Sequence, residues 1–233
     1  SNDDLLKRDR ERGFKVSEEP LIRLLVSPID DKKTILLFSQ HHAIIDGWSL
    51  NTITKKLFSF YQNPELKIKN EWVNFITKNL QLDESIASNY WKSYLAKSVE
   101  HVPTQIGIPV NHNVPAGEVY GTLAKQNHKN LLRFATSHGL TFAVVLEGIF
   151  GLMMRRYGST NGMTIGVTFS GRSQLQDPEG ALGLYINTLP VSIESSFNTK
   201  LLDYFMNLQN GQAAHDHHGW IGLSKIQKLS PYT

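Results

Sequence analysis

Two β-rich runs near the beginning of the chain place the strongest limit on what it can fold into. Residues 21–26 (Leu-Ile-Arg-Leu-Leu-Val) and 34–39 (Thr-Ile-Leu-Leu-Phe-Ser) are rich in aliphatic side chains. Pro28, Asp30 and Asp31 lie between them, and residues of these types favour turns. Two β-rich runs joined by so short a turn predict an antiparallel hairpin.

Helical periodicity follows the hairpin. Leu50, Leu57 and Tyr61 recur at the spacing of one helix face, and Asn63-Pro64 is a stop signal. Similar patterns predict helices within residues 86–95, 127–138, 142–157 and 201–208, and short apolar runs occupy residues 163–169 and 189–193. The mixture of the two periodicities indicates an α/β fold.

Local features add detail to the predicted helices. The aromatic stripe of residues 86–95 is expected to pack in the core, and it consists of Ile86, Tyr90, Trp91, Tyr94 and Leu95. Gly139 is expected to take the left-handed conformation that ends the helix before it. Thr141 is expected to cap the start of the helix after it.

Composition excludes several classes of function. The chain has 233 residues, 40% of them hydrophobic and 19% charged, which suits a packed globular chain. Its net charge of +3 is too small to indicate a nucleic-acid partner. The absence of cysteine excludes disulfides, thiol nucleophiles and cysteine-based metal sites. No apolar run approaches the roughly 20 residues that span a bilayer, and the charged residues 3–8 are unlike a signal peptide, so we expect a cytoplasmic protein with no membrane partner.

A long stretch without periodicity divides the chain. Residues 98–125 contain several residues that interrupt helices and strands, namely Pro103, Gly107, Pro109, Pro115 and Gly117. Such a stretch is typical of a connection between two lobes. We place the boundary near Ser98, which gives the segments 1–98 and 99–233.

Several reactive side chains meet in residues 41–47 (His-His-Ala-Ile-Ile-Asp-Gly), where we expect a loop between a strand and a helix. A neutral histidine can take, guide or return a proton, and a nearby aspartate can fix its tautomer or hold the loop through an ion pair. Gly47 would permit a tight turn or the close approach of another segment. Adjacent histidines also occur as ordinary loop residues and as metal ligands, so these residues alone leave the role of the segment open.

The longer segment 41–49 (His-His-Ala-Ile-Ile-Asp-Gly-Trp-Ser) resembles the HHxxxDGWS signature of condensation domains in non-ribosomal peptide synthetases, within the chloramphenicol-acetyltransferase-like superfamily. Further segments resemble the family in the same order: Arg12-Gly13-Phe14, Pro20-Leu21-Ile22-Arg23, residues 90–95, Ser170-Gly171-Arg172 and residues 183–190. The resemblance covers nearly the whole chain, but it corresponds only to the middle of a condensation domain.

The resemblance implies an α/β fold of the chloramphenicol-acetyltransferase-like type, with two lobes around a central tunnel and both lobes incomplete in this chain. Residues 1–98 would be the C-terminal part of the N-lobe, with the HHxxxDG loop, and residues 99–233 the N-terminal part of the C-lobe.

The family's activity is the formation of an amide (peptide) bond, in which an amine on an acceptor carrier protein attacks a thioester on a donor carrier protein. The implied partners are upstream donor and downstream acceptor peptidyl carrier proteins and an adjacent adenylation domain, in antibiotic or siderophore biosynthesis. The carrier proteins deliver phosphopantetheine thioesters, and the domain itself binds no cofactor.

The resemblance also implies roles for individual residues. His42, the second histidine of the motif, is the catalytic candidate that faces the amine, while His41, Asp46 and Gly47 would be structural. Asp46 is expected to pair with an arginine from an upstream segment, and Arg23 is the substitute partner available in this chain. The candidates for the tunnel wall or the contact between lobes are Trp48, Ser49, Arg172 and Asn187.

Alternative functions on the same fold stay open: an epimerisation domain, a coenzyme A-dependent acyltransferase, or a non-catalytic module that only docks carrier proteins. Epimerisation domains usually carry Gly-His-Gly-Arg where this chain has Phe-Ser-Gly-Arg at residues 169–172, which argues against that alternative. The run His-Asp-His-His at residues 215–218 suggests a metal cluster, but adjacent side chains on a flexible segment rarely converge on one ion, so we expect no metal site.

Overall fold

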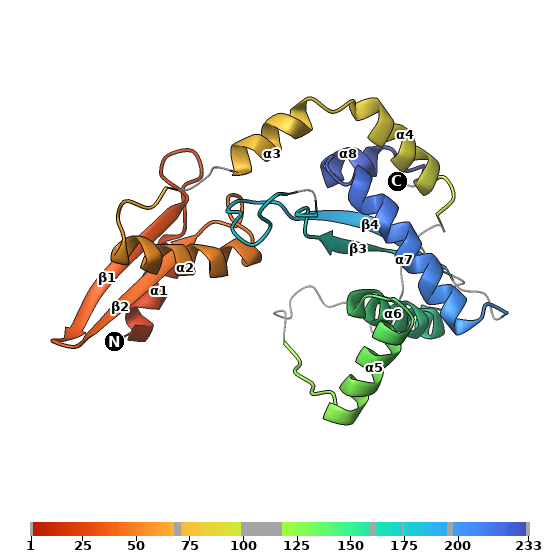
Figure 1. The fold of residues 1–233 in the computed structure, drawn as a ribbon, viewed down its shortest axis with the longest axis horizontal. Helices are drawn as coiled ribbons and strands as arrows, with labels where there is room; N and C mark the ends of the chain where they lie inside the picture. Colours follow the sequence, from red (N-terminus) through yellow and green to blue (C-terminus); the bar gives the residue numbers. More distant parts are fainter. Residues whose placement is uncertain are drawn as a thin grey trace. The chain divides into compact units, whose positions relative to one another are not determined.

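The computed structural model describes residues 2–67, 71–98, 118–158, 162–173, 175–194 and 198–231 (Figure 1). The helices are α1 (Asn2–Arg12), α2 (Gly47–Gln62), α3 (Glu71–Leu80), α4 (Glu84–Leu95), α5 (Lys125–Ser137), α6 (Phe142–Gly158), α7 (Leu201–His218) and α8 (Leu223–Lys228). The strands are β1 (Ile22–Asp30), β2 (Lys33–Gln40), β3 (Gly162–Phe169) and β4 (Asn187–Glu194). Helices and strands are mixed, so the predicted α/β class is confirmed.

The chain forms two compact units. Unit 1 comprises Ser1–Leu82 with Arg172–Ile186, and unit 2 comprises Asp83–Gly171 with Asn187–Thr233. The division therefore falls before α4 rather than near Ser98, and residues 172–186 join the earlier part of the chain. Most of the predicted connection, residues 99–117, lies outside the described residues, and the assignment of 1–98 and 99–233 to two lobes stays a prediction.

The hairpin of unit 1 confirms the first sequence prediction. Strands β1 and β2 pair antiparallel, with Leu24 opposite Phe38. Both strands extend beyond the predicted runs, and Pro28 lies within β1 rather than in the turn, next to an irregularity in the pairing. A two-stranded sheet tolerates proline because each strand has an edge where no N–H donor is required. The turn itself is closed by the Asp30 carboxylate, which accepts the Lys32 N–H at 2.8 Å.

Helix α3 was not predicted from the sequence. Its first turns are held by aromatic contacts inside unit 1: the rings of Trp72 and Phe75 lie 5.1 and 4.9 Å from the ring of Tyr185. Tyr185 follows more than a hundred residues later in the chain, so the contact that fixes α3 has no signature in the local pattern.

Unit 2 packs its helices on the antiparallel pair of β3 and β4, which lie side by side in Figure 1. One core cluster joins α5, α6 and α7 to β4 and includes Val144, Val191 and Phe205. A second joins α4 and α8 to β4 and includes Trp91 and Leu189, both fully buried. The predicted helices and both short apolar runs therefore supply most of the core of this unit, and α8, which was not predicted, adds Ile226.

The local predictions in unit 2 are confirmed in part. Gly139 has a φ of 65° after α5, and the Thr141 hydroxyl accepts the Val144 N–H at 3.2 Å at the start of α6. In α4, Trp91 is buried as expected, but Ile86 is 61% exposed, so the prediction of a core position was wrong for that residue. The spacing of Ile86 matches the stripe, yet the residue next to it, Ala87, is the one that is buried against Ile221 and Ile226.

The histidine run of residues 215–218 lies in α7 and the prediction of a flexible segment was wrong. His215 is 1% exposed, and its Nδ1 lies 2.7 Å from the Tyr90 hydroxyl while its Nε2 is buried without a hydrogen-bond partner among the described residues. The Tyr94 ring lies 4.3 Å from the imidazole, and the His218 ring stacks on Tyr90. Among the described residues there is no group of three potential ligands that could hold a metal ion.

No single helix among the described residues has the length and apolarity to cross a membrane; only the sharply bent pair of α5 and α6 meets those two criteria when combined.

Unit 2 should lose stability in acid because of His215. Burial, followed by the charge of His218, lowers the pKa of His215 from 6.5 to about 4, so the folded unit favours the neutral ring. The associated stability is fully present above pH 6.5 and is lost as the pH falls from 6.5 through 4, a change on the order of 3 kcal/mol. Urea unfolding followed over this pH range should show a smaller acid loss in His215→Phe than in the parent. Equal losses would contradict the prediction, and His128→Phe, at an exposed histidine, is the matched control.

Candidate active site

The segment between β2 and α2 is the loop that the sequence predicted. The His41 N–H donates to the Leu21 carbonyl at 2.9 Å, which ties the start of the loop to the chain just before β1. The Ile44 N–H donates to the His41 carbonyl at 3.2 Å, so residues 41–44 form a tight turn. Ile45 and Asp46 are buried at the end of the loop.

The two histidines of the loop have different surroundings. The Nδ1 atom of His41 accepts the Ala43 N–H at 3.0 Å, which fixes the orientation of the ring. The His41 ring also meets the edge of Phe14 at 6.2 Å. His42 lies at the exposed corner of the turn, and no group in the described part of the chain bonds to its ring. The loop thus holds one imidazole in place and leaves the next one available.

Asp46 and Arg172 form a buried, two-pronged ion pair. The Arg172 Nη1 and Nη2 atoms donate to the two Asp46 carboxylate oxygens at 2.6 and 2.9 Å. The side chain of Asp46 is 0% exposed and that of Arg172 is 4% exposed. The guanidinium also lies 4.4 Å from the centre of the Tyr185 ring. Paired hydrogen bonds of this kind are strong and fix both side chains in orientation.

Ser49 completes the buried network. Its hydroxyl donates to the Gly183 carbonyl at 2.9 Å and accepts from Arg172 Nη2 at 2.9 Å and from the Gly183 N–H at 3.1 Å. The Asp46 carboxylate accepts the N–H groups of Ser49 and Tyr185, and it thereby caps the N-terminus of α2. The end of the loop, the start of α2 and residues 183–185 are therefore one hydrogen-bonded cluster.

The charge state of Asp46 follows from this cluster. Burial alone would raise its pKa, but the hydrogen bonds from Arg172 and from the N–H groups of Ser49 and Tyr185 outweigh burial and keep the pKa below its ordinary value. Asp46 is thus an anion that holds the loop and has no proton to exchange near neutral pH.

The prediction that Arg23 substitutes as the partner of Asp46 was wrong. Arg23, the substitute partner, instead donates to the Asp9 carboxylate at 2.8 and 3.1 Å. The partner is Arg172, which the sequence had offered only as a candidate for a tunnel wall. A buried aspartate requires a cation, but 126 positions separate the pair, and no local pattern indicates which arginine supplies it.

The other candidates lie in different places. Trp48 is 54% exposed on the first turn of α2, 6.0 Å from the Arg172 guanidinium, whereas Ser49 is fully buried. Asn187 belongs to unit 2, where its amide donates to the carbonyls of Gly219 and Ile221 at 2.7 and 2.8 Å. Those bonds tie the start of β4 to the turn after α7.

Gly47 does not have the tight backbone that was expected. Its φ is not in the left-handed region, and no described atom outside its chain neighbours and its own helix backbone lies within 4 Å of where a Cβ would stand. Gly183 is the glycine that the site requires. Its φ is 152°, and a Cβ there would lie 2.6 Å from Cε3 of Trp72. The sequence interpretation missed Gly183 as a site residue, although it lies in a segment that had been noted for its resemblance.

A family model described as "Condensation domain" matches residues 2–233, nearly the whole chain. The chain belongs to the condensation-domain family. Condensation domains are acyltransferase-type enzymes that form amide bonds in non-ribosomal peptide synthesis, where they work with carrier-protein and adenylation domains in multidomain synthetases.

Curated relatives of this condensation domain are peptide synthetases. The chain is 29% identical to bacitracin synthase 3 of Bacillus licheniformis over 97% of its own length and 4% of the relative. It is 27% identical to gramicidin S synthase 2 of Brevibacillus brevis over 94% of its length and 5% of the relative. The chain therefore spans about a twentieth of the length of these relatives.

Solved structures share the fold. The structure of VibH, an NRPS condensation enzyme, superposes on this chain with a TM-score of 0.76 at 15% identity. The superposition covers 98% of this chain and 58% of VibH. The X-domain from teicoplanin biosynthesis gives a TM-score of 0.72 at 19% identity over 100% of this chain and 57% of that chain. These neighbours confirm the chloramphenicol-acetyltransferase-like fold that the motif segments implied.

Breaking the Asp46–Arg172 pair from one side should strongly destabilise unit 1. Arg172→Met leaves a buried, unpaired carboxylate, and we expect it to lower the free energy of unfolding by about 3–5 kcal/mol. The free energy of unfolding, measured with urea, should fall in the double variant Asp46→Asn/Arg172→Met by clearly less than the sum of the losses in Asp46→Asn and Arg172→Met. Additive losses would show that the pair is not coupled. Lys225→Met, at the exposed pair with Glu84, is the control and should change stability far less.

The two glycines should respond oppositely to the same substitution. Gly183→Ala adds a Cβ in contact with Trp72 at an unfavourable φ, and we expect a loss of about 1–3 kcal/mol in the free energy of unfolding. Gly47→Ala meets no neighbour and should leave the stability unchanged or slightly raised, because alanine is the better helix former. Thermal unfolding of the two variants side by side tests this, and equal effects would refute it.

Proposed function

We propose that this chain forms an amide bond between an acyl thioester on a donor carrier protein and an amine on an acceptor carrier protein, with His42 as the catalytic residue. The observation that carries the proposal is the asymmetry of the loop. His41 and Asp46 are occupied by contacts within unit 1, whereas His42 is exposed and has no bonding partner in the described part of the chain.

In this proposal the group that the loop supplies to the reaction is the imidazole of His42. The amine nitrogen attacks the thioester carbonyl carbon, the carbon–sulfur bond breaks, and the sulfur leaves as a thiol after it gains a proton. His42 lies on a short turn held at both ends, so its ring can orient the amine and accept the proton that the nitrogen loses. The buried ion pair at Asp46 keeps that turn in position through the reaction.

Partners follow from the substrates. We assign an upstream donor and a downstream acceptor peptidyl carrier protein, each delivering a phosphopantetheine thioester, and an adjacent adenylation domain that loads the amino acid. Residues 1–98 and 99–233 remain assigned to the N-lobe and the C-lobe, and Trp48, the exposed neighbour of Arg172, remains the candidate for a tunnel wall.

Nothing in the site favours the alternative functions. A docking module that only binds carrier proteins would have no need of an available imidazole next to a fixed one. Epimerisation and transfer from coenzyme A both use this fold, and they are separated from amide formation by their products rather than by the contacts of the loop.

The proposal predicts that His42→Ala in the full-length protein lowers the rate of amide formation by about a hundredfold or more. Mass spectrometry of the acceptor carrier protein, supplied with loaded donor and acceptor carriers, measures the product. His128→Ala, at an exposed histidine outside the loop, should retain the parental rate and is the matched control. An undiminished product in His42→Ala overturns the role of His42. A change of configuration without chain extension in the parent overturns amide formation itself.

A further inference from the structure

Strand β2 has an edge along which no other strand lies in the described part of the chain. The hairpin of unit 1 is a two-stranded sheet, in which β2 pairs with β1 alone (Figure 1). In an antiparallel pair, the N–H and C=O groups of every second residue point away from the partner strand. Outward groups of this kind are a template on which a further strand can pair.

The hydrogen bonds of the hairpin show which residues form this edge. The His41 N–H donates to the Leu21 carbonyl at 2.9 Å, and bonded residue pairs alternate with unbonded pairs along an antiparallel ladder. Counted from that bond in the observed register, the outward residues of β2 are Thr34, Leu36, Phe38 and Gln40. Pro28, which has no N–H group, lies opposite Thr34 at an outward position of β1 and fits this alternation.

The two edges of the hairpin differ in protection. Proteins commonly block an edge strand with a proline, a bulge or a charged side chain. The β1 edge contains Pro28 and an irregularity in the pairing between Pro28 and Asp30. None of the four outward residues of β2 is a proline, a glycine or a charged residue. The β2 edge is therefore the one that can accept a strand along its length.

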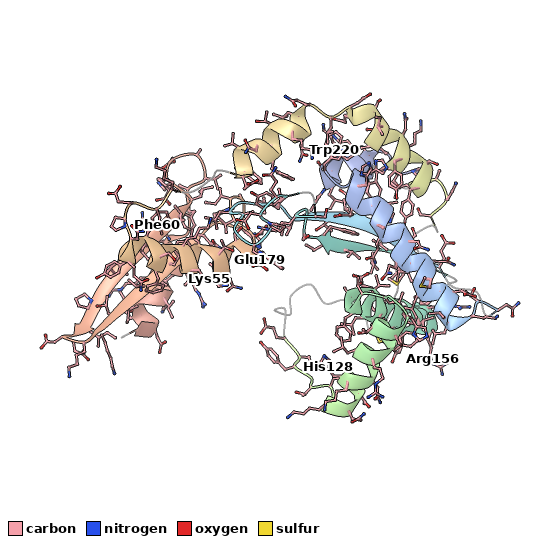
Figure 2. All side chains as sticks on the ribbon, in the orientation of Figure 1. Lys55, Phe60, His128, Arg156, Glu179 and Trp220 are labelled. Atoms are coloured by element: carbon pink, nitrogen blue, oxygen red, sulfur yellow. The ribbon has the colours of Figure 1, made fainter. Side chains whose placement is uncertain are left out.

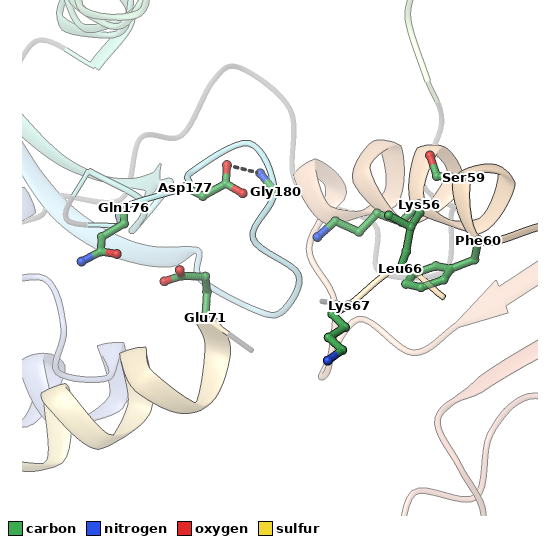
Figure 3. A pocket seen from close by; sticks show the side chains of 9 residues that line it. All are labelled: Lys56, Ser59, Phe60, Leu66, Lys67, Glu71, Gln176, Asp177 and Gly180. Atoms are coloured by element: carbon green, nitrogen blue, oxygen red, sulfur yellow. Dashed lines mark hydrogen bonds between the residues drawn. The ribbon is translucent and has the colours of Figure 1, made fainter. Parts of the chain in front are cut away.

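The apolar residues of α2 lie in different surroundings. Charged and aromatic side chains, such as Lys55 and Phe60, project from this helix (Figure 2). Phe60 lines a cleft of about 680 Å³ whose other lining residues include the charged side chains of Lys56, Lys67, Glu71 and Asp177 (Figure 3). Covering charged groups with another protein surface is unfavourable unless each of them finds a partner. Pairing at the β2 edge carries no such cost.

The sequence of β2 is complementary to itself when two copies of the strand lie antiparallel. With Leu37 opposite Leu37 of the second copy, the outward residues pair as Leu36 with Phe38 and as Thr34 with Gln40. Apolar residues then lie opposite apolar ones and polar residues opposite polar ones. A shift of two residues places Thr34 opposite Phe38 in one direction and Leu36 opposite Gln40 in the other, so the pattern favours a single register.

We propose that two copies of this chain associate by antiparallel pairing of β2 with β2 of the second copy. The product is a four-stranded sheet in the order β1–β2–β2–β1. The twofold symmetry makes each residue pair occur twice, and every outward pair exchanges two backbone hydrogen bonds. This inference is independent of the proposed function, because it uses none of the residues assigned to the reaction.

The hairpin gains stability from such a partner. A two-stranded hairpin is marginally stable by itself, whereas three or more strands with an apolar face are stable. Leu24 and Val26 lie opposite Phe38 and Leu36, and the side chains of Leu24, Val26 and Leu36 are 45, 57 and 44% exposed. Pairing places Phe38 of the second copy beside Leu36 and continues this apolar face through the centre of the sheet.

Sedimentation velocity of the full chain tests the association. Edge pairing of two short strands makes a small interface, so we expect a dissociation constant on the order of 10 µM. The chain should change from monomer to dimer between about 1 and about 200 µM. A monomer over this whole range overturns the proposal.

Two matched proline variants test the edge. Leu36→Pro removes an outward N–H group of β2 and no bond of the hairpin, so the dissociation constant of the dimer should rise about tenfold or more. Leu24→Pro removes an outward N–H group of β1 on the same face and should keep the parental constant. Equal dissociation constants in Leu36→Pro and the parent overturn the proposal.

A charge swap tests the register. Leu37→Lys and Leu37→Glu each place two like charges directly opposite each other at the twofold axis, and each should weaken the dimer about tenfold. An equimolar mixture of the two variants should regain the parental affinity, because unlike charges then lie opposite each other. A mixture that associates as weakly as either variant alone overturns the pairing.

Amide hydrogen exchange of the unsubstituted chain covers the case in which the variants do not fold. The N–H groups of Leu36 and Phe38 should exchange about tenfold or more slowly in the dimer than at a concentration where the chain is a monomer. The N–H group of Leu37, which points toward β1, should change far less. Exchange of Leu36 and Phe38 that is equally fast at both concentrations overturns the proposal. Slow exchange of both residues in the monomer shows that another segment of the same polypeptide occupies the edge, and it also overturns the second copy as the occupant.

Discussion

Asp46 and Arg172 lie 126 positions apart in the sequence, and their charges are buried together with almost no exposure to solvent. Removing two charged groups from water is unfavourable unless hydrogen bonds within the protein replace those to water, and here the Ser49 hydroxyl and two backbone N–H groups add to the bonds of the pair itself. Because those partners lie in the His42 loop, in α2 and in residues 183–185, the pair determines how the three segments of unit 1 fit together.

The residues of the 41–46 loop differ in whether contacts within unit 1 already occupy their side chains. His41 accepts a backbone N–H and Asp46 is committed to Arg172, so neither is available for a substrate. His42 sits between them in the chain and extends from the turn with no partner in the described part of the chain. A motif of two histidines and an aspartate therefore divides into two residues held by internal contacts and one exposed histidine, the residue that we propose as catalytic.

Sequence reasoning succeeded where the physics is local. The hairpin, the loop at residues 41–46, α2 and the caps at Gly139 and Thr141 all follow from spacing and turn chemistry within about a dozen residues. It failed where the deciding contact is distant, as with the partner of Asp46, the helix fixed by Tyr185 and the close approach at Gly183. It also predicted a tight turn that requires glycine at Gly47, whose φ is not in the left-handed region. The family resemblance supplied the fold, but not the internal pairing of this chain.

Residues 172–186 connect β3 to β4, two strands that pair within unit 2, yet they belong to unit 1. A chimaera that exchanges the first 82 residues between two synthetases would consequently join a new Asp46 to the Arg172, Gly183 and Tyr185 of the old parent. A chimaera takes the whole charged cluster from one parent only if it uses three crossover points together, after Leu82, before Arg172 and after Ile186. Recombination of such enzymes thus has to transfer two separate stretches, residues 1–82 and 172–186, from the same parent.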